Sequence, residues 1–199
     1  SELVFRLICR LGYFEDITTE CAECIYTGMM TDTGGFTFNS NDPEIYYIIS
    51  QLLSKGIDKD QIYRNVFNTY SEGRLRLMGH VLTHMHVYPD FRAALITLTK
   101  KEQSRFNYMR GDAEGFVNMP LSMKGIVFSV FLREDTEKDM IKVSLRSTGS
   151  FPCNQVASEF FGGGGHLNAS GGEVYGTMDE ALERFKAALV KFQPLLLKK

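Results

Sequence analysis

The sequence predicts an α/β protein in which a mostly helical portion is followed by a portion that mixes strands and helices. Up to Met85, apolar residues recur mainly at helical spacing. After Tyr88 the pattern changes, because residues 125–132 are a nearly continuous apolar run and residues 140–146 alternate between apolar and polar side chains. A glycine-rich stretch, residues 160–172, then lies between a predicted helix and a predicted strand. These observations place the sheet in the second half of the chain.

The first half contains five predicted helices, each with apolar residues at helical spacing. They cover residues 1–11, 16–26, 42–53, 58–67 and 71–85. Asp42 is placed to cap the third, with Pro43 at its first helical position. Asp58 caps the fourth, and Gln61 completes a capping box. Between the second and third helices, a short apolar segment is expected to end in the glycine-rich turn at residues 31–36.

The second half alternates strands with helices. Strands are expected over residues 91–99, 125–132, 140–146 and 173–175, and helices over residues 100–109, 151–161 and 178–192. The charged residues 134–139 form the turn of a hairpin between two of these strands. Tyr88, Pro89 and Asp90 mark the expected domain boundary.

The glycine-rich stretch has six glycines in thirteen residues, with His166 in its middle. Glycine costs backbone entropy, so such a run suits positions that need positive φ or a close approach of the backbone. Successive glycine N–H groups can bind an anion, and His166 can add a donor. A phosphate-binding loop is one interpretation, and a flexible turn is the other. The Walker and dinucleotide motifs are both excluded, because no Lys-Ser or Lys-Thr follows the glycines and Asn168 replaces a required glycine.

Composition narrows the class of protein. The chain has 199 residues, a formal net charge of −2, and 44% hydrophobic and 23% charged residues, as in ordinary globular proteins. No overall basic field points to long duplex nucleic acid, so anion binding must be local. Four cysteines without a signal sequence indicate reduced thiols in the cytoplasm. No apolar run approaches the roughly 20 residues that span a membrane.

Individual polar residues allow more than one reading. Arg146 ends a predicted strand beside Ser147, where it could grip phosphate or simply be solvated. Asp32 follows an apolar segment and precedes two glycines, which suits a ligand of a hard metal ion as well as a turn. His80, His84 and His86 lack the glutamate of a zinc-protease motif, so surface histidines fit better. Cys21 and Cys24 form one pair without a second, which favours buried thiols over a zinc ribbon.

Two separated motifs resemble the DHH phosphoesterases that carry a DHH-associated C-terminal domain. The run from Gly163 to His166, followed by Ala169 and Gly171, looks like the signature of that domain. Residues 143–147, 114–118 and 125–127 fit the same domain. Residues 31–36 look like the last metal-binding motif of the catalytic domain. The motif spelling is most similar to the nanoRNase and 3′-phosphoadenosine 5′-phosphate phosphatase subgroup, also described as exopolyphosphatase-related.

The resemblance implies a division of the chain into two parts. Residues 1–88 would be the C-terminal portion of the DHH catalytic domain, and residues 89–199 the DHH-associated substrate-binding domain with a mixed sheet. In the family, two Mn²⁺ or Mg²⁺ ions activate a water that attacks a phosphate ester. Asp32 would then be a catalytic residue and a metal ligand. The substrate-binding residues would be Arg146 and Ser147, which grip phosphate, and Gly163, Gly164, Gly165 and His166, which cradle the nucleotide end.

The implied activity is hydrolysis of short oligoribonucleotides (nanoRNA) and of 3′-phosphoadenosine 5′-phosphate in the cytoplasm. The alternatives are hydrolysis of cyclic or linear dinucleotides and a non-catalytic role in RNA binding, and a homodimer stays open. The sequence has no Asp-His-His tripeptide and no upstream paired-aspartate motif. The family places both before the helix with which this sequence begins. We therefore expect the chain as given to be an inactive fragment of such an enzyme.

Overall fold

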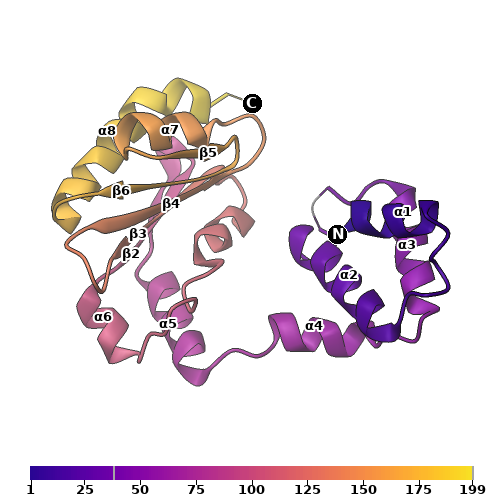
Figure 1. The fold of residues 1–199 in the computed structure, drawn as a ribbon. Coiled ribbons are helices and arrows are strands. Elements are labelled where there is room, and N and C mark those ends of the chain that lie inside the picture. The colour runs from indigo at the N-terminus through magenta and orange to yellow at the C-terminus, as the bar shows by residue number, and fades with distance from the viewer. Residues whose placement is uncertain (38, 199) are drawn as a thin grey trace. The chain divides into compact units, whose positions relative to one another are not determined.

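The computed structural model describes residues 1–37 and 39–198. The chain divides into two compact units, Ser1–Tyr70 and Ser71–Lys199 (Figure 1). The first is helical, and the second is an α/β unit with a mixed sheet, so the predicted fold class is confirmed. The boundary between family domains predicted after Tyr88 stays a prediction, whereas the compact units meet earlier, at Tyr70 and Ser71.

Four helices form the first unit around one apolar core: α1 (Glu2–Arg10), α2 (Thr19–Asp32), α3 (Pro43–Leu53) and α4 (Lys59–Phe67). The expected end of the second helix near Tyr26 is wrong, because α2 continues to Asp32. Met29 and Met30 are buried in the core, and their burial outweighs the cost of about 1 kcal/mol that Gly28 adds to the helix.

Helix caps in this unit follow the sequence with one correction. Asp42 accepts a hydrogen bond from the Glu44 backbone N–H, as expected of a cap. Asp58 likewise accepts from the backbone N–H groups of Asp60 and Gln61. The predicted capping box is wrong, because the Gln61 side chain donates to Asn65 instead of returning to the cap. The expectation that Cys21 and Cys24 are buried is also wrong, since Cys24 is exposed and Cys21 is only half-buried.

The second unit contains a six-stranded sheet with the order β1-β2-β3-β4-β6-β5. Strands β2 and β3 are parallel, and the other neighbours are antiparallel. The elements, in chain order, are α5 (Glu72–Thr83), β1 (His86–Tyr88), η1 (Pro89–Phe91), β2 (Ala93–Leu98), α6 (Lys100–Arg105), η2 (Phe116–Ser122), β3 (Phe128–Glu134), β4 (Ile141–Ser147), α7 (Cys153–Phe160), β5 (Gly164–His166), β6 (Ala169–Val174) and α8 (Met178–Leu196).

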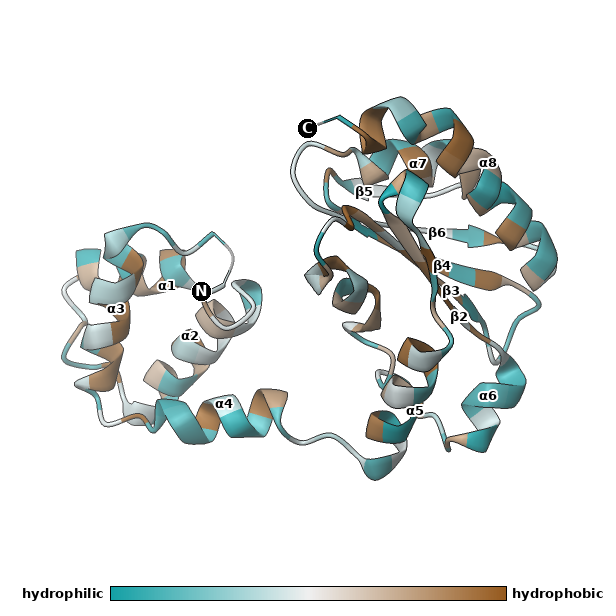
Figure 2. Ribbon diagram, turned by 180° about the vertical axis from the view of Figure 1, so that it is seen from behind, coloured by the Kyte–Doolittle hydropathy of each residue, from teal (hydrophilic) through white to brown (hydrophobic). Residues whose placement is uncertain are grey.

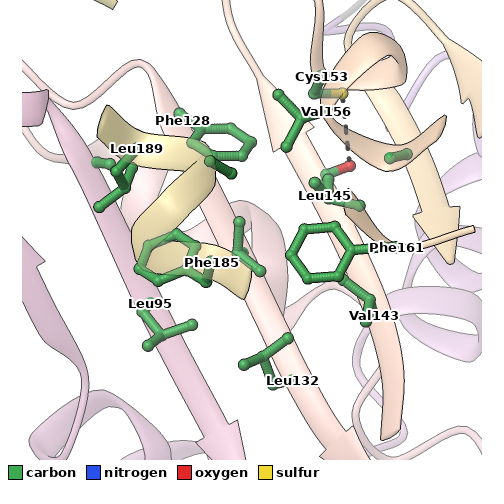
Figure 3. Packing of buried hydrophobic residues seen from close by; sticks show 14 of the residues in the cluster. Leu95, Phe128, Leu132, Val143, Leu145, Cys153, Val156, Phe161, Phe185 and Leu189 are labelled. Carbon is green, nitrogen blue, oxygen red and sulfur yellow. Dashed lines mark hydrogen bonds between the residues drawn. The ribbon is translucent and has the colours of Figure 1, made fainter. Parts of the chain in front are cut away.

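Helices α7 and α8 cover one face of this sheet (Figure 1). Phe185 and Leu189 of α8 pack there against side chains of β2 and β3, as Figure 3 shows. Hydrophobic residues gather on the central strands (Figure 2), so both of their faces are buried. On the second face α5 packs on β2, and η2 packs on β3 and β4. The second face of β4, β6 and β5, which we call the open face, carries exposed and half-buried residues.

The sequence suggested that the glycine-rich stretch is a loop between a helix and a strand. This expectation is wrong, because most of the stretch forms strands. Residues 164–166 form β5, residues 169–174 form β6, and Leu167 and Asn168 make the turn of this edge hairpin. The last predicted strand therefore begins earlier than expected. Among the described residues, every helix is too short or too polar to cross a lipid bilayer.

Asp135 closes the turn between β3 and β4. Its Oδ1 accepts hydrogen bonds from the backbone N–H groups of Glu137 and Lys138, both at 3.0 Å. Its Oδ2 lies 2.6 Å from Nζ of Lys142. The hydrogen bond from Lys142 and those from the two amides hold the pKa of Asp135 well below its usual range. The turn therefore depends on an ionised carboxylate.

We expect Asp135→Ala to lower the free energy of unfolding at neutral pH by about 1–3 kcal/mol, because two amides and an ammonium group lose their acceptor. The native pKa is depressed, so this contribution is full above about pH 4 and falls as the pH drops further. Urea unfolding as a function of pH should therefore show the wild type and variant converging in acid. Asp139→Ala removes a fully exposed carboxylate of the same turn and should have little effect. A gap that widened in acid would contradict this account.

Candidate functional site

A row of three residues crosses β4, β6 and β5. Arg146 is paired with Ala169, and Ala169 with His166. Paired residues point to the same side of a sheet, and neighbouring strands lie about 4.8 Å apart. Arg146 and His166 therefore share the open face, with their backbones about 10 Å apart. The structure brings these two predicted site residues together.

The next row along the same face consists of Ser144, Gly171 and Gly164. Gly164 is exposed, and a Cβ built on it would meet no atom within 4 Å. A side chain would fit there in the structure as it stands, so packing does not explain this glycine. A bare backbone at this position leaves room for a ligand to approach the sheet closely.

The neighbouring glycines have a different explanation. A Cβ on Gly163 would lie 1.9 Å from the Gly171 carbonyl oxygen, and one on Gly165 would lie 2.6 Å from the Ala169 carbonyl oxygen. Gly165 also has φ +142°, a conformation that favours glycine. Both residues are thus required by the close approach of backbone to backbone within the hairpin. Of the three glycines predicted to cradle the nucleotide, Gly164 is the one for which packing within the described residues gives no reason.

Ser147 lies on the other face of β4, under α7 and α8, and is buried. Its Oγ donates to the Phe151 carbonyl oxygen at 2.7 Å and accepts from Asn168 Nδ2 at 2.8 Å. The predicted contact of Ser147 with phosphate remains a prediction. Its hydrogen bonds favour a supporting role beneath Arg146 instead.

Sequence reasoning missed the residues that fix the turn next to His166. Asn168 Nδ2 donates to the Gly149 carbonyl oxygen at 3.1 Å as well as to Ser147, and so ties the turn to the loop after β4. Ser170 Oγ donates to the His166 carbonyl oxygen at 2.8 Å. The buried Cys153 thiol lies near the same group of oxygens, with Leu145 O at 3.8 Å (Figure 3). The sequence signal that could have revealed this turn is Asn168, because asparagine is favoured in tight turns.

The open face offers donors that the rest of the protein does not use. Within the described residues, Arg146 makes one side-chain hydrogen bond, from Nη1 to the Leu145 carbonyl oxygen at 2.9 Å. The other N–H groups of its guanidinium fork are available to an anion. The His166 side chain is exposed and has no hydrogen-bond partner in the part of the chain that the structure describes. Neither row described above contains a carboxylate, so nothing in them opposes a negatively charged ligand.

Asp32 is the last residue of α2 and is exposed. Residues 1–37 and 39–198 contain no group of three or more histidine, cysteine, aspartate or glutamate side chains arranged to hold a metal ion. One carboxylate does not make a site for Mn²⁺ or Mg²⁺, which take several oxygen ligands. The residues of this chain therefore do not fit a two-ion centre by themselves. His80, one of the three histidines expected on the surface, is half-buried, and its Nε2 shares a hydrogen bond with Glu102 Oε1 at 2.7 Å.

These features define an α/β module whose sheet is covered by α7 and α8 on one face, while the other face is covered by α5 and η2 over the central strands and carries unused donors toward β5. Comparison with known proteins identifies it further. The chain belongs to the DHHA1 domain family, which matches residues 92–192. The resemblance seen in the sequence is thereby confirmed.

Relatives with known names point the same way. The protein called bifunctional oligoribonuclease and PAP phosphatase NrnA from Thermus thermophilus is 34% identical over 191 residues, which cover 95% of this chain and 55% of that protein. The protein of the same name from Bacillus subtilis is 27% identical and covers 91% of this chain and 56% of its own length. The crystal structure of an exopolyphosphatase-related protein from Bacteroides fragilis matches with a TM-score of 0.96 and 71% identity, over 99% of this chain and 57% of that one. The chain thus spans a little over half the length of these relatives.

Proposed function

We propose that this chain is the substrate-holding part of a metal-dependent phosphoesterase that hydrolyses short oligoribonucleotides and 3′-phosphoadenosine 5′-phosphate in the cytoplasm. The observation that carries the proposal is the row of Arg146, Ala169 and His166 beside the bare backbone of Gly164. Two relatives are named for oligoribonuclease and PAP phosphatase activity, and both substrates are anionic nucleotides.

In this proposal the open face binds and orients the substrate. The guanidinium of Arg146 makes a bidentate contact with a phosphate group. His166 donates a hydrogen bond to a second polar group of the same ligand, and Gly164 lets the ligand lie close to the sheet. Fixing a phosphate in this way lowers the entropic barrier to its reaction.

Asp32 is proposed as one ligand of the Mn²⁺ or Mg²⁺ ions used by the whole enzyme. Such ions supply Lewis-acid activation of phosphate and water when they are bound. The remaining ligands are not supplied by the described residues, so the chain as given is proposed to bind substrate without hydrolysing it.

Two other functions would use the same face. A phosphodiesterase for cyclic or linear dinucleotides would need the same grip on phosphate, and only a comparison of substrates separates it from the first proposal. A non-catalytic RNA-binding module would have no use for Asp32, so hydrolysis by the whole protein would exclude it.

The proposal is tested by isothermal titration of the chain with 3′-phosphoadenosine 5′-phosphate and with a diribonucleotide, each with and without Mn²⁺. We expect both ligands to bind, adenosine to bind more weakly because it has no phosphate, and neither ligand to be hydrolysed. Absence of nucleotide binding by the folded chain would contradict the substrate-holding role. Hydrolysis by the chain alone would show that its own residues complete the metal site, against the single-ligand role of Asp32.

A further inference from the structure

The open face has a second polar end. Arg133, Lys142 and Glu173 are register partners across β3, β4 and β6. Lys142 and Arg146 are four residues apart on one strand, so their side chains lie on the same face. The row of Ser144, Gly171 and Gly164 lies between these two polar ends. One continuous surface of small residues therefore connects them.

A cavity of about 280 Å³ opens at this second end. Its walls include Tyr108 and Arg110, which follow α6, the strand residues Arg133 and Lys142, and the turn closed by Asp135. The sheet provides its floor and an irregular segment provides its side. This arrangement is a concave site on an otherwise flat face.

The charges in this cavity are unevenly paired. Lys142 is held by Asp135, and Glu173 accepts a hydrogen bond from the Tyr175 hydroxyl at 3.0 Å. Arg133 stacks over the Tyr108 ring, with 5.4 Å from Cζ to the ring centroid. In the described part of the chain, neither Arg133 nor Arg110 forms an ion pair or a side-chain hydrogen bond. Two guanidinium groups beside an aromatic ring are thus left for a ligand.

A nucleotide matches this chemistry. Guanidinium groups bind phosphate in bidentate fashion. Bases of single-stranded nucleic acid stack on tyrosine rings and on the planes of arginine side chains. The carboxylate of Glu173 at the cavity rim can accept hydrogen bonds from ribose hydroxyls. A ligand without a base would leave the aromatic wall unused.

We propose that this cavity is a second nucleotide subsite, which binds an RNA residue further along a chain whose end lies at Arg146 and His166. This inference rests on the proposed function. The two ends are separated by four residues of β4, about 13 Å. A stacked strand advances about 3.4 Å per nucleotide, so an oligoribonucleotide of about four or five residues is needed to reach both ends. A dinucleotide or 3′-phosphoadenosine 5′-phosphate does not, and the open face therefore distinguishes substrates by length.

The test compares the affinities of the chain for oligoadenylates of two to five residues, measured by fluorescence anisotropy with a 3′ or 5′ label. Arg133→Ala is expected to weaken binding of the four-residue RNA by about tenfold, the effect of losing roughly one stacking or charged contact, and to leave the dinucleotide unchanged. Tyr108→Ala should act in the same way, whereas Tyr108→Phe should bind like the wild type. Arg184→Ala, which removes the same type of side chain from α8 on the covered side of the sheet, is the matched control. Thermal unfolding of each variant excludes loss of fold.

The outcomes separate this inference from the function on which it rests. Equal weakening of all lengths by Arg133→Ala, or no weakening of the four-residue RNA, would overturn the second subsite while leaving the proposed function intact. Wild-type chain that is folded but binds none of the oligonucleotides would overturn both. A loss that appears only beyond two residues supports the subsite.

Discussion

Replacing Gly163 with alanine is expected to lower the free energy of unfolding by about 3 kcal/mol or more, because the added methyl group has no space. Its Cβ would lie 1.9 Å from the Gly171 carbonyl oxygen and 2.5 Å from Gly172 Cα. Both neighbours are backbone atoms of β6, which is paired on both sides. The clash can be relieved only by moving the edge hairpin. Thermal unfolding should show a midpoint lower by about 10 °C or more.

Gly164→Ala is the matched control and should separate packing from function. It adds the same methyl group one residue later, where no atom lies within 4 Å. We expect a stability within about 0.5 kcal/mol of the wild type. If the ligand approaches the bare backbone, nucleotide affinity should nevertheless fall about tenfold or more. A Gly164→Ala chain that binds nucleotide like the wild type would show that the ligand does not approach the backbone at Gly164, whereas a stable Gly163→Ala chain would contradict the packing account.

These two neighbours also show how far the sequence alone could lead. The run of glycines predicted that other atoms approach the backbone closely here, and the structure shows such close approaches at Gly163 and Gly165. The sequence could not say that at Gly163 and Gly165 the close partner is the protein's own β6. That distinction depends on which strand lies alongside, and pairing between distant strands leaves little trace in local composition.

The alternation of side chains along β4 explains why the structure separates Arg146 from Ser147. Arg146 and Ser147 are adjacent in sequence, so they looked like one phosphate-binding group. In a strand, adjacent residues point to opposite faces. The alternation in residues 140–146 did predict this, because Leu145 and Val143 are the apolar partners of Ser147 on the covered face. Extending the alternation from Arg146 to Ser147 would have predicted that these two side chains lie on opposite faces of the sheet.

Helical portions and strands with strong patterns were predictable, and their ends less so. The caps at Asp42 and Asp58 and the hairpin around Asp135 follow from local chemistry. The continuation of α2 to Asp32 does not, because it depends on burial of Met29 and Met30 in a core built from other helices. Asp32 itself is placed by that continuation at a helix end, and its proposed metal role concerns the longer protein.

Arg146→Ala is expected to weaken binding of a diribonucleotide and of 3′-phosphoadenosine 5′-phosphate by about 10- to 100-fold. A hydrogen bond to a charged group contributes about 1.5–3 kcal/mol, and the guanidinium has most of its donors free for the ligand. Stability should change little, because its one side-chain hydrogen bond goes to the neighbouring carbonyl group. Titration calorimetry gives the affinities, and Arg184→Ala on α8 again controls for loss of an arginine elsewhere in the unit.

Comparing Arg146→Lys with Arg146→Ala distinguishes a bidentate phosphate contact from a general effect of positive charge. Arg146→Lys keeps the charge but cannot make a planar bidentate contact, so we expect it to recover only a small part of the lost affinity. His166→Ala should weaken binding less than Arg146→Ala. Because one ligand would span the row from Arg146 to His166, the double variant should lose less affinity than the sum of the two single losses. Full recovery by lysine would reduce Arg146 to a point charge, and an unchanged affinity of His166→Ala would mean that His166 does not contact the ligand.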